Sequence, residues 1–266
     1  MKLAFSSCPN DTFVFHAWVH GLVDGAPVPE VTYADVDVTN TRALSGEFDV
    51  VKVSYAALPW LRDQYELLPC GGALGRGCGP LVLAREAREP ESLRHSTVAV
   101  PGERTTAYLL FRLWSQGFTP ENIVVVPFAQ IMPGIASGRF DAGLVIHEAR
   151  FTYHEHGLTM MEDLGDWWER ETGCPIPLGA ILARKGLDTD AIAGWIRASL
   201  AHAWAHPADS ASYVAEHSQE LSPEVTRQHI ELYVNEFTAE LGDAGRDAVD
   251  TLLGHAAAAG LVPGNA

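Results

Sequence analysis

The segment SGEFDVV at residues 45–51 recurs 92 residues further along the chain as SGRFDAG at residues 137–143. In both copies the serine and glycine are typical of the end of a helix, because glycine tolerates the backbone conformation that closes one. The apolar residues that follow the aspartate are typical of the start of a strand. The repeat therefore indicates that one helix-to-strand junction occurs twice in the chain.

The elements upstream of each copy match as well. Residues 97–100 resemble the apolar run at residues 3–5, and hydroxyl-bearing residues that can begin a helix follow both runs. Residues 123–126 match residues 31–38, where apolar and polar side chains alternate as in a half-buried strand. The pattern predicts two successive βαβαβ units, which favour parallel sheets with right-handed crossovers.

Local signals place further elements in the first unit. Turn and N-cap residues at 6–12 precede apolar positions at helical spacing, which predicts a helix that Gly21 ends. Thr39 and Asn40 are expected to cap a short second helix, and residues 50–53 are expected to form the third strand.

The remainder of the chain indicates how the units are arranged. Residues 178–183 are expected to form one more strand, and from Asp188 onward the chain is Ala-rich and helical. We expect this tail to pack on the first unit, which makes the first domain discontinuous (1–85 plus 185–266) around a second domain (92–180). The fold class is therefore α/β with two lobes, two crossings that form a hinge, and a ligand cleft at the carboxyl ends of the strands.

Charge limits the classes of partner. The chain has 266 residues, with 18 Lys and Arg against 34 Asp and Glu, so its formal net charge is -16. Such a field repels nucleic acid and anionic membranes, and neither is expected as a partner. The uncharged stretch at residues 123–138 is 16 residues long and contains two prolines, which is too short for a membrane span. A small-molecule ligand is the remaining expectation.

The cysteines and the N-terminus indicate the compartment. Cys8, Cys70, Cys78 and Cys174 form no CxxC motif or disulfide framework, so reduced thiols are expected. The first apolar run ends at Ser6, which is too soon for a secretory signal. We expect a cytoplasmic protein, or a mature form that has lost its leader.

Polar side chains follow the predicted strands of both units at the edge where the cleft is expected. They can donate to or accept from a small carboxylate or hydroxyl, and the predicted helix starts add backbone NH groups and positive dipole ends. For several of these residues, a role in capping a helix or turn is the alternative. The candidates are Ser6, Asn10, Thr12, Ser54, Thr105, Thr106 and His147.

His147 is the candidate for proton transfer. It follows the apolar run at residues 143–146, where a buried strand opens into the cleft, and an imidazole there can act as a general base or acid. A structural, hydrogen-bonded histidine is the alternative. Glu148 is expected to face the opposite way and to orient a helix or to pair with Arg150.

Two other types of chemistry have weaker support. His147, Glu148, His154, Glu155 and His156 contain no HExxH pattern and no third ligand at a recognised spacing, so no metal site is expected.

A nucleophilic cysteine is the second type. Cys8 stands at a helix start, where a thiol can be activated, but the adjacent Pro9 and the packing expected there favour a structural role.

The chain resembles a known enzyme family in four segments. They are SCPNDTF at 7–13, KVSY at 52–55, PG at 101–102 with TTA at 105–107, and IHEARFTY at 146–153. With these segments, the sequence is similar to the 1,4-dihydroxy-6-naphthoate synthase family of the futalosine route to menaquinone, over nearly its whole length. It departs from the family pattern at Ser7, where proline is more usual, and at Ala149, where glycine is usual.

This resemblance implies a fold similar to type II periplasmic binding proteins, used for cytoplasmic catalysis. It also implies a lyase without a cofactor that cleaves a carbon-carbon bond of cyclic dehypoxanthinyl futalosine. The products would be 1,4-dihydroxy-6-naphthoate and a three-carbon sugar fragment. The family's catalytic histidine corresponds to His147, and its substrate-binding serine and threonines correspond to Ser54, Thr105 and Thr106.

Two alternatives remain open at the level of sequence. The related chorismate dehydratase shares the fold and much of the cleft, and a solute-binding protein for a small carboxylate would share both without turnover. A homodimer is possible. Whether Arg76, Arg104 or Arg150 meets a substrate carboxylate is also open.

Overall fold

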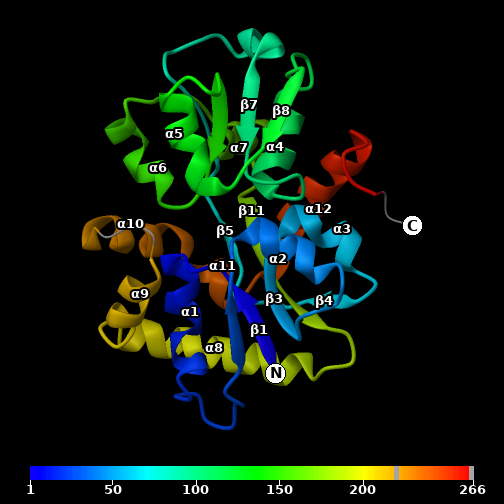
Figure 1. Ribbon diagram of the computed structural model, residues 1–266. Coiled ribbons are helices and arrows are strands. Elements are labelled where there is room, and N and C mark those ends of the chain that lie inside the picture. The colour runs from blue at the N-terminus through cyan, green and yellow to red at the C-terminus, as the bar shows by residue number, and fades with distance from the viewer. Residues whose placement is uncertain (219–221, 264–266) are drawn as a thin grey trace.

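The structure is a computed structural model that describes residues 1–218 and 222–263, and within them the chain forms two sheets flanked by helices (Figure 1). The first sheet defines the first lobe; it has six strands in the order β2-β1-β3-β11-β4, with β5 paired to β11. Its strands are β1 (Lys2–Phe5), β2 (Glu30–Tyr33), β3 (Val50–Ser54), β4 (Tyr65–Leu67), β5 (Ala73–Gly75) and β11 (Ile176–Arg184).

The second sheet defines the second lobe and has five strands in the order β10-β6-β9-β7-β8. Its strands are β6 (Leu81–Ala84), β7 (Thr97–Val100), β8 (Asn122–Val125), β9 (Ala142–Val145) and β10 (Thr159–Asp163). In each lobe the three strands of one βαβαβ unit are parallel. By contrast, β11 pairs antiparallel with β3 in the first lobe, and β6 pairs antiparallel with β9 in the second. The prediction of parallel sheets is correct for the repeated units and wrong for the complete sheets, because β11 in the first sheet and β6 in the second run opposite to their neighbours.

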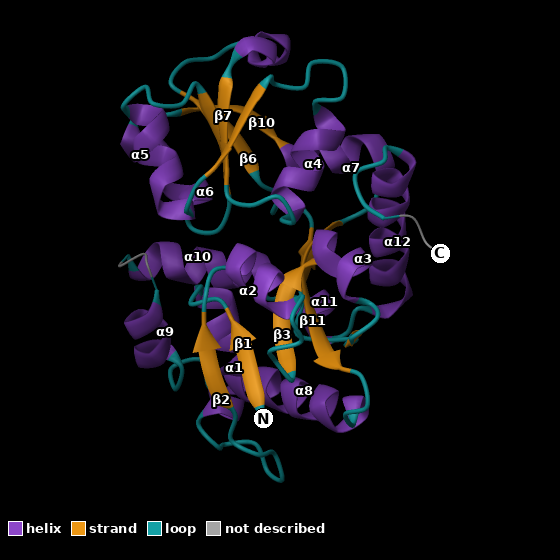
Figure 2. Cartoon of the chain, turned by 45° about the vertical axis from the view of Figure 1, so that its right-hand side comes forward, coloured by secondary structure: helices purple, strands orange, loops and turns teal. Residues whose placement is uncertain are grey.

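Helices cover both sheets, and most helices after β11 pack on the first lobe (Figure 2). The rings of Trp18 in α1 and Trp195 in α8 are 5.8 Å apart, and the backbone NH of Trp18 donates to Ser199 Oγ at 3.1 Å. The predicted packing of the tail is therefore confirmed. The helices are α1 (Pro9–Val19), α2 (Val36–Ala43), η1 (Tyr55–Ala57), α3 (Leu58–Leu61), η2 (Pro90–His95), α4 (Thr106–Trp114), η3 (Phe128–Gln130), α5 (Ile131–Ala136), α6 (Ala149–Thr152), η4 (Tyr153–His156), α7 (Leu164–Thr172), α8 (Thr189–Ala205), α9 (Ala211–His217), α10 (Pro223–Tyr233), α11 (Glu236–Ala239) and α12 (Gly242–Ala258).

The sequence repeat lies at the same place in both lobes. It joins α2 to β3 in the first lobe and α5 to β9 in the second. Gly46 and Gly138 follow the two helices with φ values of 67° and 79°, in the left-handed region that glycine adopts without a steric penalty. The repeat is therefore a shared device for ending a helix and starting a strand.

Residues 31–38 do not form one strand as predicted, because α2 begins at Val36. Thr39 and Asn40 lie inside α2 rather than before it, so the predicted cap is wrong. Both are buried together with Ala43, at the three- and four-residue spacing of one helix face. The helical spacing of these buried residues therefore indicates the observed structure, whereas the local alternation of apolar and polar residues does not.

The sheets also shift the expected domain boundaries. The strand β6 belongs to the second sheet although it falls within 1–85, and β11 belongs to the first sheet although its first half falls within 92–180. The chain therefore crosses to the second lobe before β6 and returns to the first lobe before β11. The division of the chain into two domains remains a prediction, with its boundaries moved to these points.

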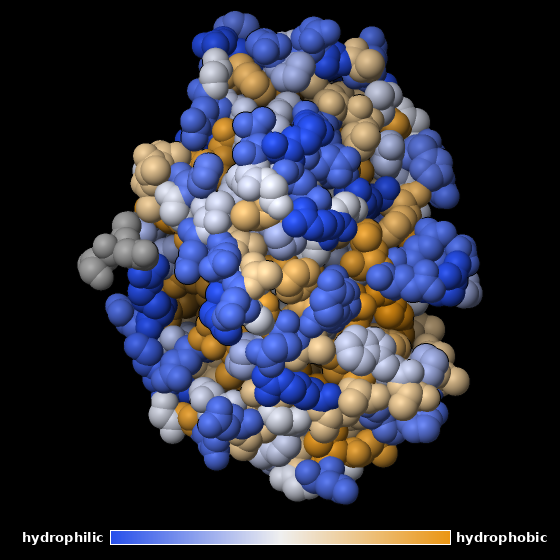
Figure 3. Space-filling model, turned by 180° about the vertical axis from the view of Figure 1, so that it is seen from behind, coloured by the Kyte–Doolittle hydropathy of each residue, from blue (hydrophilic) through white to orange (hydrophobic). Residues whose placement is uncertain are grey.

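Hydrophilic side chains dominate the face seen in Figure 3, with smaller hydrophobic areas between them. In residues 1–218 and 222–263, no helix has the length and apolar character needed to cross a bilayer.

Candidate active site between the lobes

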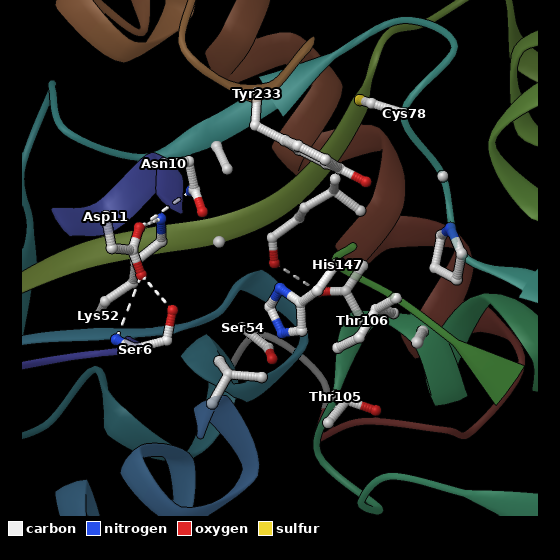
Figure 4. A pocket seen from close by; sticks show the side chains of 18 of the residues that line it. Ser6, Asn10, Asp11, Lys52, Ser54, Cys78, Thr105, Thr106, His147 and Tyr233 are labelled. Carbon is white, nitrogen blue, oxygen red and sulfur yellow. Dashed lines mark hydrogen bonds and ion pairs between the residues drawn. The ribbon is translucent and has the colours of Figure 1, made fainter. Parts of the chain in front are cut away.

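The main cavity lies between the lobes and contains about 690 Å³ of empty space, including its open mouth. Residues at or just after the carboxyl ends of β1, β3, β7 and β9 line it, as expected for a cleft in this class of fold. Figure 4 shows side chains from both lobes gathered around this space. The predicted site residues that line the main cavity are Ser6, Asn10, Ser54, Thr105, Thr106 and His147.

Thr12 is the predicted site residue that does not line the main cavity. Its side chain is fully buried in α1, and its hydroxyl donates to the backbone carbonyls of Cys8 and Pro9 at 3.1 and 3.3 Å. The predicted role of Thr12 in the cleft wall is wrong, because the hydroxyl turns back onto its own helix.

His147 has an unusual backbone. Among the described residues it is the only non-glycine with a positive φ, at 58°. This conformation costs about 1–2 kcal/mol for a residue with a Cβ atom, and such strain is common at functional sites. With this backbone conformation, His147 lines the wall of the main cavity.

The imidazole of His147 is close to a thiol from the other lobe. Its Nδ1 lies 3.2 Å from Cys8 Sγ. Burial, with a smaller contribution from the Glu148 carboxylate, raises the pKa of the Cys8 thiol well above its usual value. Cys8 therefore remains a neutral thiol at physiological pH, which argues against a nucleophilic thiolate.

Burial also shifts the titration of His147. It lowers the pKa of the imidazole to about 4; the charge of Asp11 opposes this shift and that of Lys52 adds to it. His147 is consequently neutral at physiological pH and has a free lone pair with which to accept a proton.

One group of side chains has the composition of a metal site. A ligand atom from each of Cys8, His147 and Glu148 lies within 4.8 Å of the others. Thiolate, imidazole and carboxylate together are ligands that zinc accepts. The three could hold such an ion; the expectation that the protein uses no metal remains a prediction.

A buried ion pair forms the first-lobe wall. Lys52 pairs with Asp11, and their side chains are 9% and 2% exposed. Asp11 also accepts hydrogen bonds from the hydroxyl of Ser6 at 2.7 Å and the amide of Asn10 at 3.0 Å (Figure 4). Sequence reasoning missed both charged residues, although a lysine in the apolar strand VVKVS was a signal for a buried, paired charge.

Asn40 positions Ser54. Its Oδ1 accepts from the backbone NH of Ser54 at 2.8 Å, and its Nδ2 donates to Ser54 Oγ at 3.0 Å. Because the Ser54 oxygen is the acceptor in this contact, its own proton can be donated to a ligand in the main cavity.

The hydroxyls of Thr105 and Thr106 are already engaged. Thr105 caps α4: it accepts from the NH of Tyr108 at 3.2 Å and donates to the carbonyl of Gly102 at 2.7 Å. Thr106 donates to the carbonyl of Leu178 at 2.9 Å, which links the second lobe to β11. The start of α4 can therefore offer an anionic ligand its backbone NH groups and its positive dipole end rather than hydroxyl protons.

None of the three candidate arginines lines the main cavity. Arg76 pairs with Glu169 at 3.1 Å, and Arg150 pairs with Asp163 at 2.5 Å. Arg104 lines a different pocket. Lys52 is the only lysine or arginine among the described residues of the cavity wall.

Glu148 contributes to the surroundings of His147 and does not pair with Arg150, contrary to one of the predicted roles. Its Oε2 lies 4.0 Å from Nδ1 of His229, a residue of α10. The Nε2 of His229 lies 3.0 Å from Asn10 Oδ1, and burial lowers the pKa of His229 well below its usual value. Sequence reasoning missed His229 because no local pattern shows that α10 returns to the cleft.

Comparisons with known proteins show the family of this chain. Residues 1–258 match the model of a family described as menaquinone biosynthesis. Two curated relatives are both named 1,4-dihydroxy-6-naphthoate synthase. That of Streptomyces coelicolor is 58% identical over 99% of this chain and 95% of its own length, and that of Thermus thermophilus is 49% identical over 98% and 95%.

Solved structures support the fold. A protein of Archaeoglobus fulgidus superposes with a TM-score of 0.91 at 32% identity, over 98% of both chains. An alkanesulfonate-binding protein of Xanthomonas axonopodis pv. citri superposes with a TM-score of 0.72 at 13% identity, over 99% of this chain and 94% of that chain, and shows the fold alone. The predicted periplasmic-binding-protein-like fold is confirmed, and the chain belongs to the menaquinone biosynthesis family.

Proposed function

We propose that this protein is a 1,4-dihydroxy-6-naphthoate synthase, a cytoplasmic lyase that cleaves a carbon-carbon bond of cyclic dehypoxanthinyl futalosine without a cofactor. The observation that carries the proposal is a neutral, strained His147 in the cavity between the lobes, in a chain 58% identical to a relative of that name. A homodimer remains a prediction.

The proposed chemistry needs a base. Opening a ring next to a carbonyl and forming an aromatic product requires removal of a proton, for which a neutral imidazole is suited. We assign the Nδ1 proton of His147 to its contact with Cys8 Sγ, which leaves Nε2 unprotonated. In this assignment Cys8 is a positioning residue that selects the reactive tautomer.

The developing negative charge on the substrate needs donors. Ser54 can donate its hydroxyl proton, and the start of α4 behind Thr105 and Thr106 offers backbone NH groups. Lys52 adds a positive charge, which Asp11 balances before the substrate binds. Ser6 and Asn10 keep Asp11 in place, and we assign them to the substrate wall of the first lobe.

The direct test is to incubate EDTA-treated protein with cyclic dehypoxanthinyl futalosine and to follow the naphthoate product by absorbance and mass. Product from the wild type and none above background from His147→Ala supports both the reaction and the base. Tight binding without product would point to a solute-binding protein, and dehydration of chorismate would point to the sibling enzyme; either result overturns the proposal.

A further inference from the structure

A second pocket lies where the two lobes meet the segment after α12. It contains about 290 Å³ of empty space, including its open mouth. Trp60 of α3 lines it from the first lobe, Arg104, Tyr108 and Arg112 line it from the second lobe, and Leu261 and Val262 line it from the C-terminal segment. We call it the arginine pocket.

The two arginines of this pocket have no carboxylate partner among the described residues, in a chain with a net charge of -16. Their Nε atoms are buried without a hydrogen-bond partner in the described part of the chain. The one hydrogen bond found there for either side chain is from Nη1 of Arg112 to the hydroxyl of Tyr108, at 3.2 Å. A buried donor without an acceptor is costly, so both guanidinium groups are suited to receive an anion.

Aromatic rings hold both guanidinium groups. The Cζ of Arg104 lies 5.7 Å from the ring centroid of Trp60, and the Cζ of Arg112 lies 5.8 Å from that of Tyr108. Each guanidinium group is therefore within cation–π range of a ring, and its NH groups other than the one bonded to Tyr108 can meet a planar anion. Leu261 and Val262 add apolar surface beside these charges.

The charge balance of the pocket limits the ligand. Exposed Glu103 also lines it, so the two arginines and this glutamate together give one net positive charge. A monoanion therefore matches the pocket better than a dianion such as phosphate. The aromatic rings and apolar side chains of the wall favour a flat aromatic body over a small hydrophilic one.

We propose that the arginine pocket is a second ligand site, separate from the main cavity, that binds an aromatic monocarboxylate. The carboxylate lies between Arg104 and Arg112, and the ring packs against Trp60 and the C-terminal segment. This proposal does not depend on the reaction assigned to the main cavity.

The probe is 2-naphthoate, titrated into the full chain labelled with ¹⁵N in its tryptophan indoles. The Trp60 signal is identified by its loss in Trp60→Phe. We expect this signal to shift saturably, and the affinity to fall about tenfold or more in Arg112→Gln, because a charge-assisted hydrogen bond is lost. Arg112→Lys keeps the positive charge without the forked geometry of a guanidinium group. Its affinity for the probe should lie between those of the wild type and Arg112→Gln.

Three controls test whether the probe binds in the arginine pocket and whether binding needs its charge. Arg139→Gln removes the same charge from an exposed arginine outside the pocket, and His147→Asn alters the main cavity; both should leave the Trp60 titration unchanged. Naphthalene-2-carboxamide tests the need for charge and should bind at least tenfold more weakly. Any one of three results overturns the proposal. Millimolar 2-naphthoate causes no shift of the Trp60 signal, or the carboxamide binds as tightly as 2-naphthoate. The third is that the folded double variant Arg104→Gln/Arg112→Gln binds 2-naphthoate as tightly as the wild type.

Discussion

The two βαβαβ units share a scaffold down to single hydrogen bonds. Asp49 of the first copy of the repeat accepts from the backbone NH of the first residue of β1 at 2.8 Å, and Asp141 of the second copy accepts from the first residue of β7 at the same distance. The strand that follows the repeat pairs in parallel with β1 or β7 in the corresponding lobe. These contacts set the register of the strands, so the same residue type, an aspartate, makes them in both units.

The groups that the two units bring to the main cavity differ. The first unit brings the Asp11–Lys52 ion pair to the main cavity, and the second brings neutral His147 and the start of α4. These groups line the main cavity, so they differ between the units without changing the register that the two scaffolds share. Two units with the same scaffold therefore carry different chemistry at the main cavity.

The largest effect is expected at the second-lobe strand end. His147→Asn removes the proposed base but keeps a polar side chain of similar size, and kcat should fall by roughly 10²- to 10⁴-fold. Steady-state kinetics measures the loss, with His154→Asn, an exposed histidine of the same lobe, as the control. Wild-type turnover by a folded His147→Asn protein would remove the base assignment.

Changes to the ion pair in the first-lobe wall should alter the free energy of unfolding. Lys52→Met leaves the carboxylate of Asp11 buried without its cation and should lower the free energy of unfolding by about 3–5 kcal/mol. The double variant Asp11→Asn/Lys52→Met should recover much of this loss in urea denaturation. Arg246→Gln, which breaks the exposed pair with Asp243, should cost less than about 1 kcal/mol. Equal losses from Lys52→Met and Arg246→Gln would contradict the assigned role of burial.

The pH dependence of stability should report the burial of His147. Burial holds the pKa of His147 at about 4, against 6.5 for an ordinary histidine, so between these values the unfolded chain binds a proton that the native protein does not. The free energy of unfolding should therefore fall as the pH is lowered from 6.5 to 4, and less steeply in His147→Asn. If base catalysis limits the rate, the acid limb of kcat/KM should lie well below pH 6.5. Parallel unfolding curves for the two proteins would argue against the shift.

The smallest effects are expected where the units agree. Gly46→Ala and Gly138→Ala each place a Cβ at positive φ, and each should cost about 1–2 kcal/mol. The new Cβ atoms would come closest to the ends of flexible side chains, Gln64 at Gly46 and Arg85 at Gly138.

A helical glycine provides the control for this pair. Gly254→Ala in α12 has open space for its Cβ and should be neutral or slightly stabilising by thermal denaturation. Unequal costs at Gly46 and Gly138 would show that the repeat does not serve both lobes alike.

Short-range patterns carried most of the fold prediction. Helix ends, strand alternation and the repeat around Gly46 and Gly138 depend on neighbouring residues, so the order of elements and the position of His147 beside a strand could be predicted. The same local reasoning was wrong for residues 31–38 and for Thr12, because a residue's neighbours do not determine which competing contact it makes.

Only the tertiary structure decided which distant groups meet. It brings Cys8 to His147 across 139 residues of chain and His229 to Asn10 across 219. It also takes Arg104 out of the main cavity into the arginine pocket. The physical reason is that a sequence pattern records which face of an element is buried, whereas the partner and the pKa of a buried polar group depend on all the elements packed around it.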